Sequence, residues 1–186
     1  QINMSKENAD KEQKRSFKRE VFSWIACIVV TILLTEFILN FVIINANIPS
    51  GSMENTIMTN DKLIALRTSY WFNDPKRGDI IIFKYPDDET EWFIKRVIAL
   101  PGETVLVKDG KVYINGSKKA LSEPYIKEEP VEDFGPYKVP KNGYFVMGDN
   151  RNNSNDAREW ETHYVSRDEV LGKAWFRYYP SIKVIK

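Results

Sequence analysis

The sequence has almost none of the residues that build disulfides, zinc sites and histidine-based catalysis. Its 186 residues include one cysteine, Cys27, and one histidine, His163. A single cysteine cannot form an intramolecular disulfide, and no Cys/His cluster has the spacing of a zinc site. The formal net charge is +1, so nothing indicates nucleic acid as a partner. His163 lies in the polar segment ETHYVSRDE, where we interpret it as a surface residue, which disfavours a Ser-His-Asp triad.

Charge is also scarce in a long apolar run near the N-terminus. Residues 21–44 carry one charged side chain, Glu36. As a helix this run would measure about 36 Å, enough to cross a hydrocarbon core of about 30 Å. The run is longer than the apolar region of a signal peptide and no Ala-x-Ala-like site follows it, which favours an uncleaved anchor. We expect Glu36 to be protonated or hydrated and hydrogen-bonded to Asn40. The alternative is a contact with another membrane helix.

Basic residues gather just before this run. Residues 1–20 hold six lysines and arginines against four acidic side chains. The positive-inside rule therefore predicts a cytoplasmic basic tail over 1–20, a transmembrane anchor over 21–44 and an outer domain over 45–186. This topology indicates a single-pass membrane protein, in contact with lipid, with its N-terminus in the cytoplasm and its main domain outside.

The outer domain has the patterning of β structure. Asp109-Gly110 separates two short β-branched runs and predicts a type I′ hairpin turn. We interpret residues 84–91 as a polar linker and residues 117–142 as extended loops. Runs rich in isoleucine, valine and aromatic residues predict strands at Asp79–Phe83, Trp92–Leu100, Thr104–Lys108, Lys111–Ile114, Tyr144–Met147 and Lys173–Tyr179.

A candidate nucleophile follows the apolar run closely. Residues 49–53 read Pro-Ser-Gly-Ser-Met and begin five residues after Ile44. A serine on a Gly-containing turn beside an anchor can act on chains that emerge from a membrane. No serine has a lysine three positions later, so the Ser-x-x-Lys site of β-lactamases is excluded. A serine paired with a more distant lysine remains.

Lys95 is the strongest candidate for the base. A lysine acts as a general base only when it is neutral, so its pKa must fall from about 10.4, which burial in an apolar environment can achieve. Lys95 lies in the run WFIKRVI, and on a period of two it shares a face with Phe93 and Val97. The alternative interpretation is a salt-bridged lysine at a sheet edge.

A polar loop, GDNRNNSNDAR, occupies residues 148–158. It superficially resembles a calcium-binding loop. Positions three, six and twelve of such a loop would be Arg151, Ser154 and Trp160, which do not suit those roles, so calcium is excluded and no metal is expected. As a plain loop, the segment would be a polar turn fixed by aspartate and asparagine side chains and an Asp-Arg pair.

Taken together, these elements resemble the type I signal peptidases, membrane-anchored endopeptidases with a Ser-Lys dyad. The resemblance covers the chain from Pro49 to about Arg158, and its features appear in the family's order. They are Ser50-Gly51-Ser52-Met53 after the anchor, then Arg77-Gly78-Asp79-Ile80, Ile94-Lys95-Arg96-Val97-Ile98 and Leu100-Pro101-Gly102-Glu103, then Gly148-Asp149-Asn150-Arg151 with Ser154, Asp156 and Arg158. Gly172-Lys173-Ala174 and Tyr179-Pro180 also match.

The resemblance implies a mainly β fold. One N-terminal transmembrane helix would be followed by an extracytoplasmic antiparallel β-sheet catalytic domain with a small inserted β subdomain at about 102–140. It also implies a serine endopeptidase that removes signal peptides from secretory preproteins at the outer face of the cytoplasmic membrane. Cleavage would follow small residues at positions −1 and −3. No cofactor is implied.

The resemblance assigns four serine and lysine roles. Ser52 would be the nucleophile and Lys95 the general base. Ser154 would hydrogen-bond to the Lys95 amine and orient it. The Ser52 backbone N–H and the Ser50 hydroxyl would form the oxyanion hole.

Three further side chains would support these groups. Met53 would pack beside the nucleophile and line the substrate cleft. Asp156 and Arg158 would pair and hold the loop of residues 148–158 against the site. Asn55 and Asn60 stand where the family usually has proline and glycine, which affects the turn just past the nucleophile.

Two alternatives share parts of this pattern. A non-enzymatic, membrane-tethered β domain would explain the anchor and the aromatic residues. It would not explain Ser52, Lys95 and Ser154 in the family's order. A soluble-type Ser-Lys autoprotease of the repressor class would not need the anchor, and no obvious DNA-binding helix pair is present. The sequence does not indicate an oligomeric state.

Overall fold

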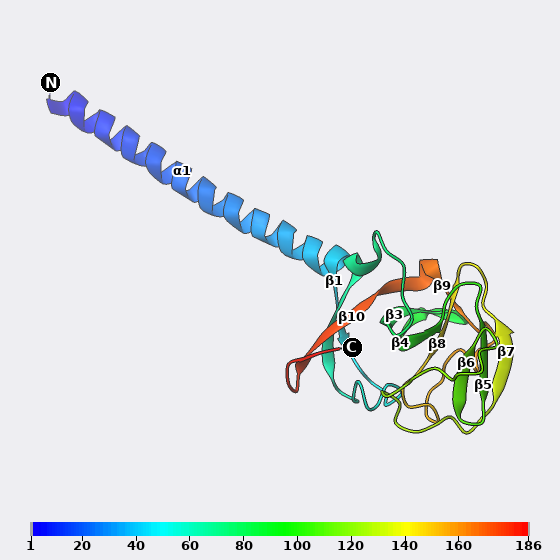
Figure 1. Cartoon of the computed structure of the whole chain (residues 1–186). Coiled ribbons are helices and arrows are strands. Elements are labelled where there is room, and N and C mark those ends of the chain that lie inside the picture. The colour runs from blue at the N-terminus through cyan, green and yellow to red at the C-terminus, as the bar shows by residue number, and fades with distance from the viewer. Residues whose placement is uncertain (1, 186) are drawn as a thin grey trace. The chain divides into compact units, whose positions relative to one another are not determined.

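The chain folds as two compact units that divide between Phe41 and Val42. The computed structural model describes residues 2–185, with side chains from residue 15 onward. The first unit is helical and the second is built mainly from strands (Figure 1). The prediction of a mainly β fold with one N-terminal helix is confirmed.

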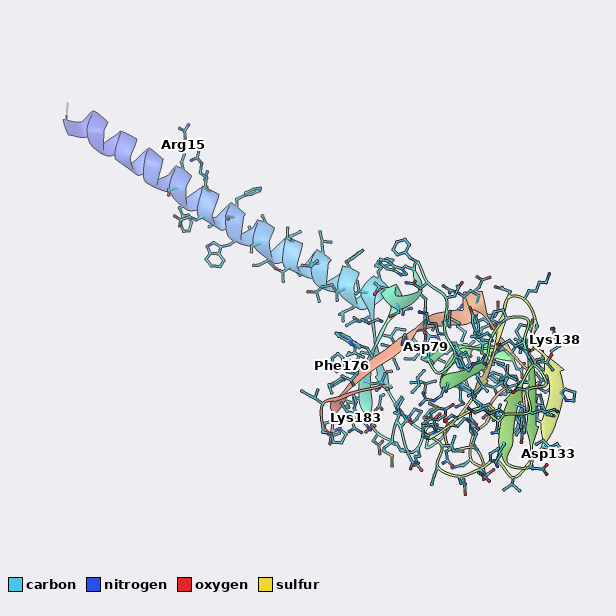
Figure 2. The ribbon with its side chains drawn as sticks, in the orientation of Figure 1. Arg15, Asp79, Asp133, Lys138, Phe176 and Lys183 are labelled. Atoms are coloured by element: carbon cyan, nitrogen blue, oxygen red, sulfur yellow. The ribbon has the colours of Figure 1, made fainter. Side chains whose placement is uncertain are left out.

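The first unit is the long helix α1, Ile2–Phe37, which continues into a π-helical turn at Ile38–Val42. The stretch Arg15–Val42 is long and apolar enough to cross a membrane. Its side chains project from all sides of the helix (Figure 2). The Asn40 amide donates to the Glu36 carbonyl oxygen at 2.8 Å and to the Glu36 carboxylate at 3.1 Å. The first bond competes with the α-helical hydrogen bond to that carbonyl, which accounts for the wider π turn.

The apolar run ends as a strand rather than as a helix. Ile43 and Ile44, which the sequence placed in the anchor, begin strand β1, Ile43–Asn47. β1 pairs antiparallel with β2, Lys62–Leu66. Ile44 is buried in the protein core. Composition alone cannot distinguish an apolar residue that faces lipid from one that faces a core, so the predicted boundary ran past the helical backbone.

The larger sheet has eight strands in the order β1-β2-β10-β3-β4-β8-β9, with β11 paired to β10. Its strands pair antiparallel throughout the described part of the chain. The short 3-10 helices are η2, Arg67–Tyr70, and η3, Arg167–Glu169. The remaining strands are β3 Ile80–Tyr85, β4 Asp88–Ala99, β8 Gly143–Met147, β9 Val165–Ser166, β10 Val170–Tyr179 and β11 Lys183–Val184.

A second sheet of three strands follows in the order β6-β5-β7 (Figure 1). It contains β5, Thr104–Lys108, β6, Lys111–Ile114, and β7, Phe134–Lys138. The β5–β6 hairpin is confirmed with its predicted bounds. Asp109 and Gly110 have φ values of 51° and 75°, as a type I′ turn requires. The prediction of loops throughout 117–142 was wrong at β7, whose Gly-Pro interior hides its strand character.

Strands β3 and β4 form one continuous hairpin. Tyr85 pairs with Asp88, so only Pro86 and Asp87 form the turn. The prediction of a polar linker over 84–91 was therefore wrong. Hydrogen bonds from the backbone N–H groups of Glu161 and Thr162 to the Asp87 carboxylate, each 3.0 Å, fix this turn against a later loop. Backbone pairing of Tyr85 with Asp88 and of Lys84 with Trp92 makes these polar residues part of the hairpin, and the Asp87 side chain holds its turn to the later loop.

The larger sheet packs apolar residues on both faces. Along β3, Ile81 and Phe83 belong to the core shared with the smaller sheet, whereas Ile80 and Ile82 belong to a second core beside β1 and β2. This alternation follows from the two-residue period of a strand. Because both faces are covered, a lysine in the adjacent strand β4 lies in a low-dielectric environment.

Candidate active site

Ser52 lies in the turn between β1 and β2, and hydrogen bonds fix that turn to the loop of residues 148–158. The Asn150 side chain donates to the Gly51 carbonyl oxygen at 3.0 Å, and the Asn150 N–H donates to the Ser52 carbonyl oxygen at 3.1 Å. Within the turn, the Ile57 N–H donates to the Met53 carbonyl oxygen at 2.9 Å. Ser52 is 7% exposed. The backbone of a candidate nucleophile is therefore held from both sides.

Lys95 comes from β4 and meets Ser52 directly. Its Nζ donates to Ser52 Oγ at 2.7 Å and lies 5.4 Å from the centre of the Phe93 ring. Lys95 is 4% exposed. Burial lowers the pKa of the Lys95 amine from 10.5 to about 8, although the charges of Asp156 and Asp149 oppose this change. At pH 7 about a tenth of such amines are neutral, so the group can accept a proton.

The Ser50 hydroxyl donates to Ser52 Oγ at 3.5 Å, a long contact. Ser50 itself is exposed. Among the residues that the structure describes, the Ser52 N–H has no hydrogen-bond acceptor. The Ser50 hydroxyl and the Ser52 N–H are therefore two donors near Ser52 Oγ, and neither forms a strong hydrogen bond with another described residue.

The expected hydrogen bond from Ser154 to the Lys95 amine is not formed. Ser154 is 7% exposed, and its Oγ has no hydrogen-bond partner within the described part of the chain. The hydroxyl lies beside Gly148, where an added Cβ would meet Ser154 Oγ and the Ser52 carbonyl oxygen. Gly148 therefore allows this loop to approach the Ser52 turn closely. The sequence indicated that Ser154 would be near the site, but it could not give the direction of the hydroxyl.

Asp156 and Arg158 form an ion pair that fixes the loop internally. Arg158 Nε donates to Asp156 Oδ1 at 2.8 Å, and the Gly148 N–H donates to Asp156 Oδ2 at 2.9 Å. Arg158 Nη2 also donates to the Arg151 carbonyl oxygen at 2.6 Å. Asp156 is fully buried. One carboxylate thus joins the two ends of the loop.

Met53 does not line the cleft, contrary to expectation. Its side chain is fully buried in the second core with Ile57 and Leu63. A residue that follows an exposed turn position can direct its side chain inward, and here apolar burial is the stronger preference. Met53 therefore stabilises the Ser52 turn by anchoring it in the second core. Past it, Asn60 has a φ of 68°, a left-handed conformation that asparagine tolerates in place of glycine.

A network of buried charges behind β4 was missed by the sequence analysis. Arg96 donates to both Asp149 oxygens, at 2.9 and 2.7 Å. Its guanidinium also lies 3.8 Å from the centre of the Tyr125 ring. Arg151 is paired with Glu123 at 2.6 and 3.0 Å. Glu123 and Tyr125 lie far away in sequence in an aperiodic segment, and no local pattern identified them.

Tyr125 completes this network as a donor. Burial, followed by the negative charge of Glu123, raises the pKa of the Tyr125 hydroxyl. The hydroxyl therefore stays protonated and donates to Glu123 Oε1 at 3.0 Å. Through Arg96 and Asp149 the network joins β4, next to Lys95, to the 148–158 loop, and through Arg151 and Glu123 it joins that loop to the segment that holds Tyr125.

A cavity of about 700 Å³ opens onto this site, and Ser50, Ser52, Lys95 and Ser154 are among the residues that line it. His163 does not line it. Its Nδ1 lies 2.7 Å from the Ala157 carbonyl oxygen, and its ring packs edge-on against Phe134. Among the described residues, no group of three or more His, Cys, Asp and Glu side chains is placed to hold a metal ion. The site offers a hydroxyl, an amine and two further hydrogen-bond donors, an arrangement that suits acyl transfer.

Known proteins share this sequence over most of its length. Residues 21–179 match the family described as "Signal peptidase, peptidase S26". A probable signal peptidase I-2 of Synechocystis sp. is 44% identical over 161 residues, covering 84% of this chain and 72% of that protein. The signal peptidase I of Bacillus amyloliquefaciens is 34% identical over 185 residues, covering 94% and 97%. The crystal structure of a signal peptidase I from Enterococcus faecalis V583 is 36% identical, covering 54% of this chain and 97% of that chain, with a TM-score of 0.47.

The family match and the relatives extend over the apolar helix, the turn that carries Ser52 and the strand that carries Lys95. The resemblance drawn from the sequence motifs is therefore confirmed. The chain belongs to the signal peptidase family, peptidase S26, and is a peptidase.

Proposed function

We propose that the protein is a type I signal peptidase that removes N-terminal signal peptides from secretory preproteins. Cleavage follows small residues at positions −1 and −3. The observation that carries this proposal is the 2.7 Å contact between Ser52 Oγ and a buried Lys95 amine whose pKa is lowered to about 8. The names of the relatives support the substrate class.

In the proposed reaction, neutral Lys95 accepts the proton of the Ser52 hydroxyl as Oγ attacks the scissile carbonyl carbon. The tetrahedral intermediate then collapses, the C–N bond breaks, and the Lys95 ammonium returns a proton to the leaving amine. A water molecule, deprotonated by the same amine, hydrolyses the acyl-enzyme and regenerates the Ser52 hydroxyl. One residue thus serves as base and acid in both halves of the reaction.

The Ser52 N–H and the Ser50 hydroxyl stabilise the oxyanion in this mechanism. Donors of this kind contribute about 10²–10³ in rate each. Ser50 reaches Ser52 Oγ only at 3.5 Å in the free protein. Such contacts often shorten when substrate binds. The Ser154 hydroxyl, which has no hydrogen-bond partner among the described residues, supplies a third polar group beside the amine.

The substrate binds as an extended strand along β4. In the first part of β4, Asp88 and residues 92–94 pair with β3, and none of residues 88–94 pairs with β8, whose pairing begins at Arg96. This part of β4 therefore has an edge to which a peptide can add. Side chains at −1 and −3 lie on one face of such a peptide, so one wall of the cavity reads both.

The helix α1 anchors the enzyme in the cytoplasmic membrane. The six basic residues among the first twenty favour an N-terminus in the cytoplasm, which places the catalytic domain outside. At that surface the enzyme meets preproteins as they emerge.

Preprotein processing by the full chain in detergent tests this function. Ser52→Ala and Lys95→Ala should each abolish cleavage while the near-ultraviolet circular dichroism of the folded chain persists. Ser117→Ala is the matched control, because Ser117 is an exposed loop residue whose hydroxyl, among the described residues, bonds only to the backbone of nearby Lys119. Acylation of Ser52 by a penem-type inhibitor, located by mass spectrometry, separates this enzyme from a non-catalytic β domain. Normal cleavage by folded Lys95→Ala would reject the dyad.

A further inference from the structure

Acidic side chains outnumber basic ones among the residues that line the active-site cavity. Besides Lys95, they are two glutamates, Glu91 and Glu159. Both are exposed, and neither forms an ion pair with any residue whose side chain the structure describes. The nearby cation Arg67 lies 5.7 Å from the Trp92 ring and does not line the cavity. With Lys95 neutral, the wall of the cavity therefore carries two uncompensated negative charges.

The fold holds these two glutamates on one cavity although they are far apart in sequence. Glu91 lies in β4, on the arm of the β3–β4 hairpin. Asp87, at the tip of that hairpin, accepts backbone hydrogen bonds from Glu161 and Thr162, each 3.0 Å. Glu159 precedes that segment, and its N–H donates to the Asp156 carbonyl oxygen at 2.8 Å. The two carboxylates are thus carried by backbone that is fixed at both ends.

The glutamates do not serve the general base. The acidic groups that act on the Lys95 amine are Asp156 and Asp149, not Glu91 or Glu159. Ser154 also lines this cavity, and its buried Oγ has no hydrogen-bond partner within the described residues. An unpartnered hydroxyl and two unpaired carboxylates among the residues that line one cavity indicate that the cavity binds a polar ligand.

We propose that Glu91 and Glu159 select substrates with a lysine or arginine close to the cleavage site. This inference rests on the proposed function, since it assumes that the peptide occupies the Ser52 cavity. Glu91 is four residues from Lys95 along β4, which corresponds to roughly 13 Å at the rise of a β-strand. An extended peptide covers that distance in about four residues. The basic side chain therefore lies within about five residues of the scissile bond.

A set of peptides tests this specificity on the full chain in detergent. Each peptide keeps alanine at −1 and −3 and carries Lys, Gln or Glu at one other position from −6 to +5. The measured quantity is the ratio of kcat/KM for the Lys peptide to that for the matched Gln peptide, so a general loss of activity cancels. At one or two positions this ratio should be about fivefold for the wild type, since exposed ion pairs contribute modestly. It should fall as salt is added.

The variants locate the effect. In the Glu91→Gln, Glu159→Gln double variant the ratio should fall to about one, and in Glu91→Lys the Glu peptide should become the better substrate. Glu89→Gln is the control, because Glu89 lies on the same hairpin, pairs with Lys84 at 3.3 Å and does not line the cavity. It should keep the wild-type ratio.

Two results would overturn the proposal, and they differ from a failure of the enzyme itself. Equal rates for Lys and Gln peptides at every position would exclude the specificity alone. A Lys preference that survives in the double variant would assign it to other residues. If the wild type cleaves no peptide of the set and no preprotein, the endopeptidase function is contradicted and the specificity falls with it.

Discussion

Two neighbouring basic residues on strand β4 differ in whether a carboxylate lies beside them. Lys95 and Arg96 are 4% and 2% exposed, so burial is nearly the same for both. Arg96 meets both oxygens of Asp149, the Gly78 carbonyl oxygen at 2.8 Å and the face of Tyr125. Lys95 meets a hydroxyl, that of Ser52, and an aromatic ring.

The difference shows how one strand can carry a charged side chain that stabilises the structure beside an amine that is able to act as a base. On the side of β4 that carries Arg96, the Asp149 carboxylate offsets the cost of desolvating the guanidinium, and this ion pair fixes the loop of residues 148–158. On the other side, no carboxylate of the described residues forms an ion pair with Lys95, and burial lowers the pKa of its amine to about 8. A buried amine without an acidic partner becomes a base.

The largest expected effect comes from giving Lys95 the chemistry of its neighbour. Arginine stays protonated at any accessible pH, so Lys95→Arg should lower kcat/KM for preprotein cleavage by at least about 10³-fold. Lys173→Arg is the matched control, because Lys173 is half-exposed and already paired with Asp79 at 2.6 Å. It should retain most of the activity. Substantial cleavage by Lys95→Arg would show that this side chain need not be neutral.

The next effect comes from removing the partner of Arg96. Asp149→Ala should lower the free energy of unfolding by about 3–5 kcal/mol, because it leaves a buried guanidinium without its carboxylate. Urea denaturation of the full chain in detergent measures this change. Asp74→Ala removes the carboxylate of an exposed pair with Arg167, in which the Asp74 side chain is 80% exposed. That control should change stability by less than about 1 kcal/mol. Equal losses in the two variants would contradict the contrast in burial.

A smaller effect of opposite sign is expected from Lys95→Met. The pKa of Lys95 is lower in the folded state than in the unfolded state, so the unfolded chain binds the proton more tightly. Lys95 therefore costs stability below pH 8, and the cost diminishes as pH rises from 8 to 10.5. At pH 7 the free energy of unfolding of Lys95→Met should exceed that of the wild type by about 1–3 kcal/mol, while the variant loses activity. A thermal-unfolding series from pH 7 to 10 should show the gain shrinking, and a constant or negative difference would argue against a neutral amine.

Much of the site was predictable because its motifs are local. The Ser52 turn, the Lys95 strand and the 148–158 loop each carry their identity within a few residues, and the structure brings all three together. The β5–β6 hairpin was predictable for the same reason, since Asp109-Gly110 specifies its turn.

What escaped prediction depends on contacts between distant segments. Strand β7 lies in a segment without periodicity. Glu123, the partner of Arg151, lies in the same segment. The inward direction of Met53 and the unbonded hydroxyl of Ser154 depend on how the loop and turn pack, because each residue type is compatible with either orientation. Sequence patterns locate such groups near the site but do not orient them.

The central claim is that Lys95, neutral through burial, deprotonates Ser52, and the pH dependence of kcat/KM for preprotein cleavage tests it most directly. Because the neutral amine is the active form, kcat/KM should rise about tenfold per pH unit below the pKa and level off above it. We expect an apparent pKa near 8, the value that burial gives the Lys95 amine. A limb near the ordinary histidine value of about 6.5 that disappears in His163→Ala would contradict the account.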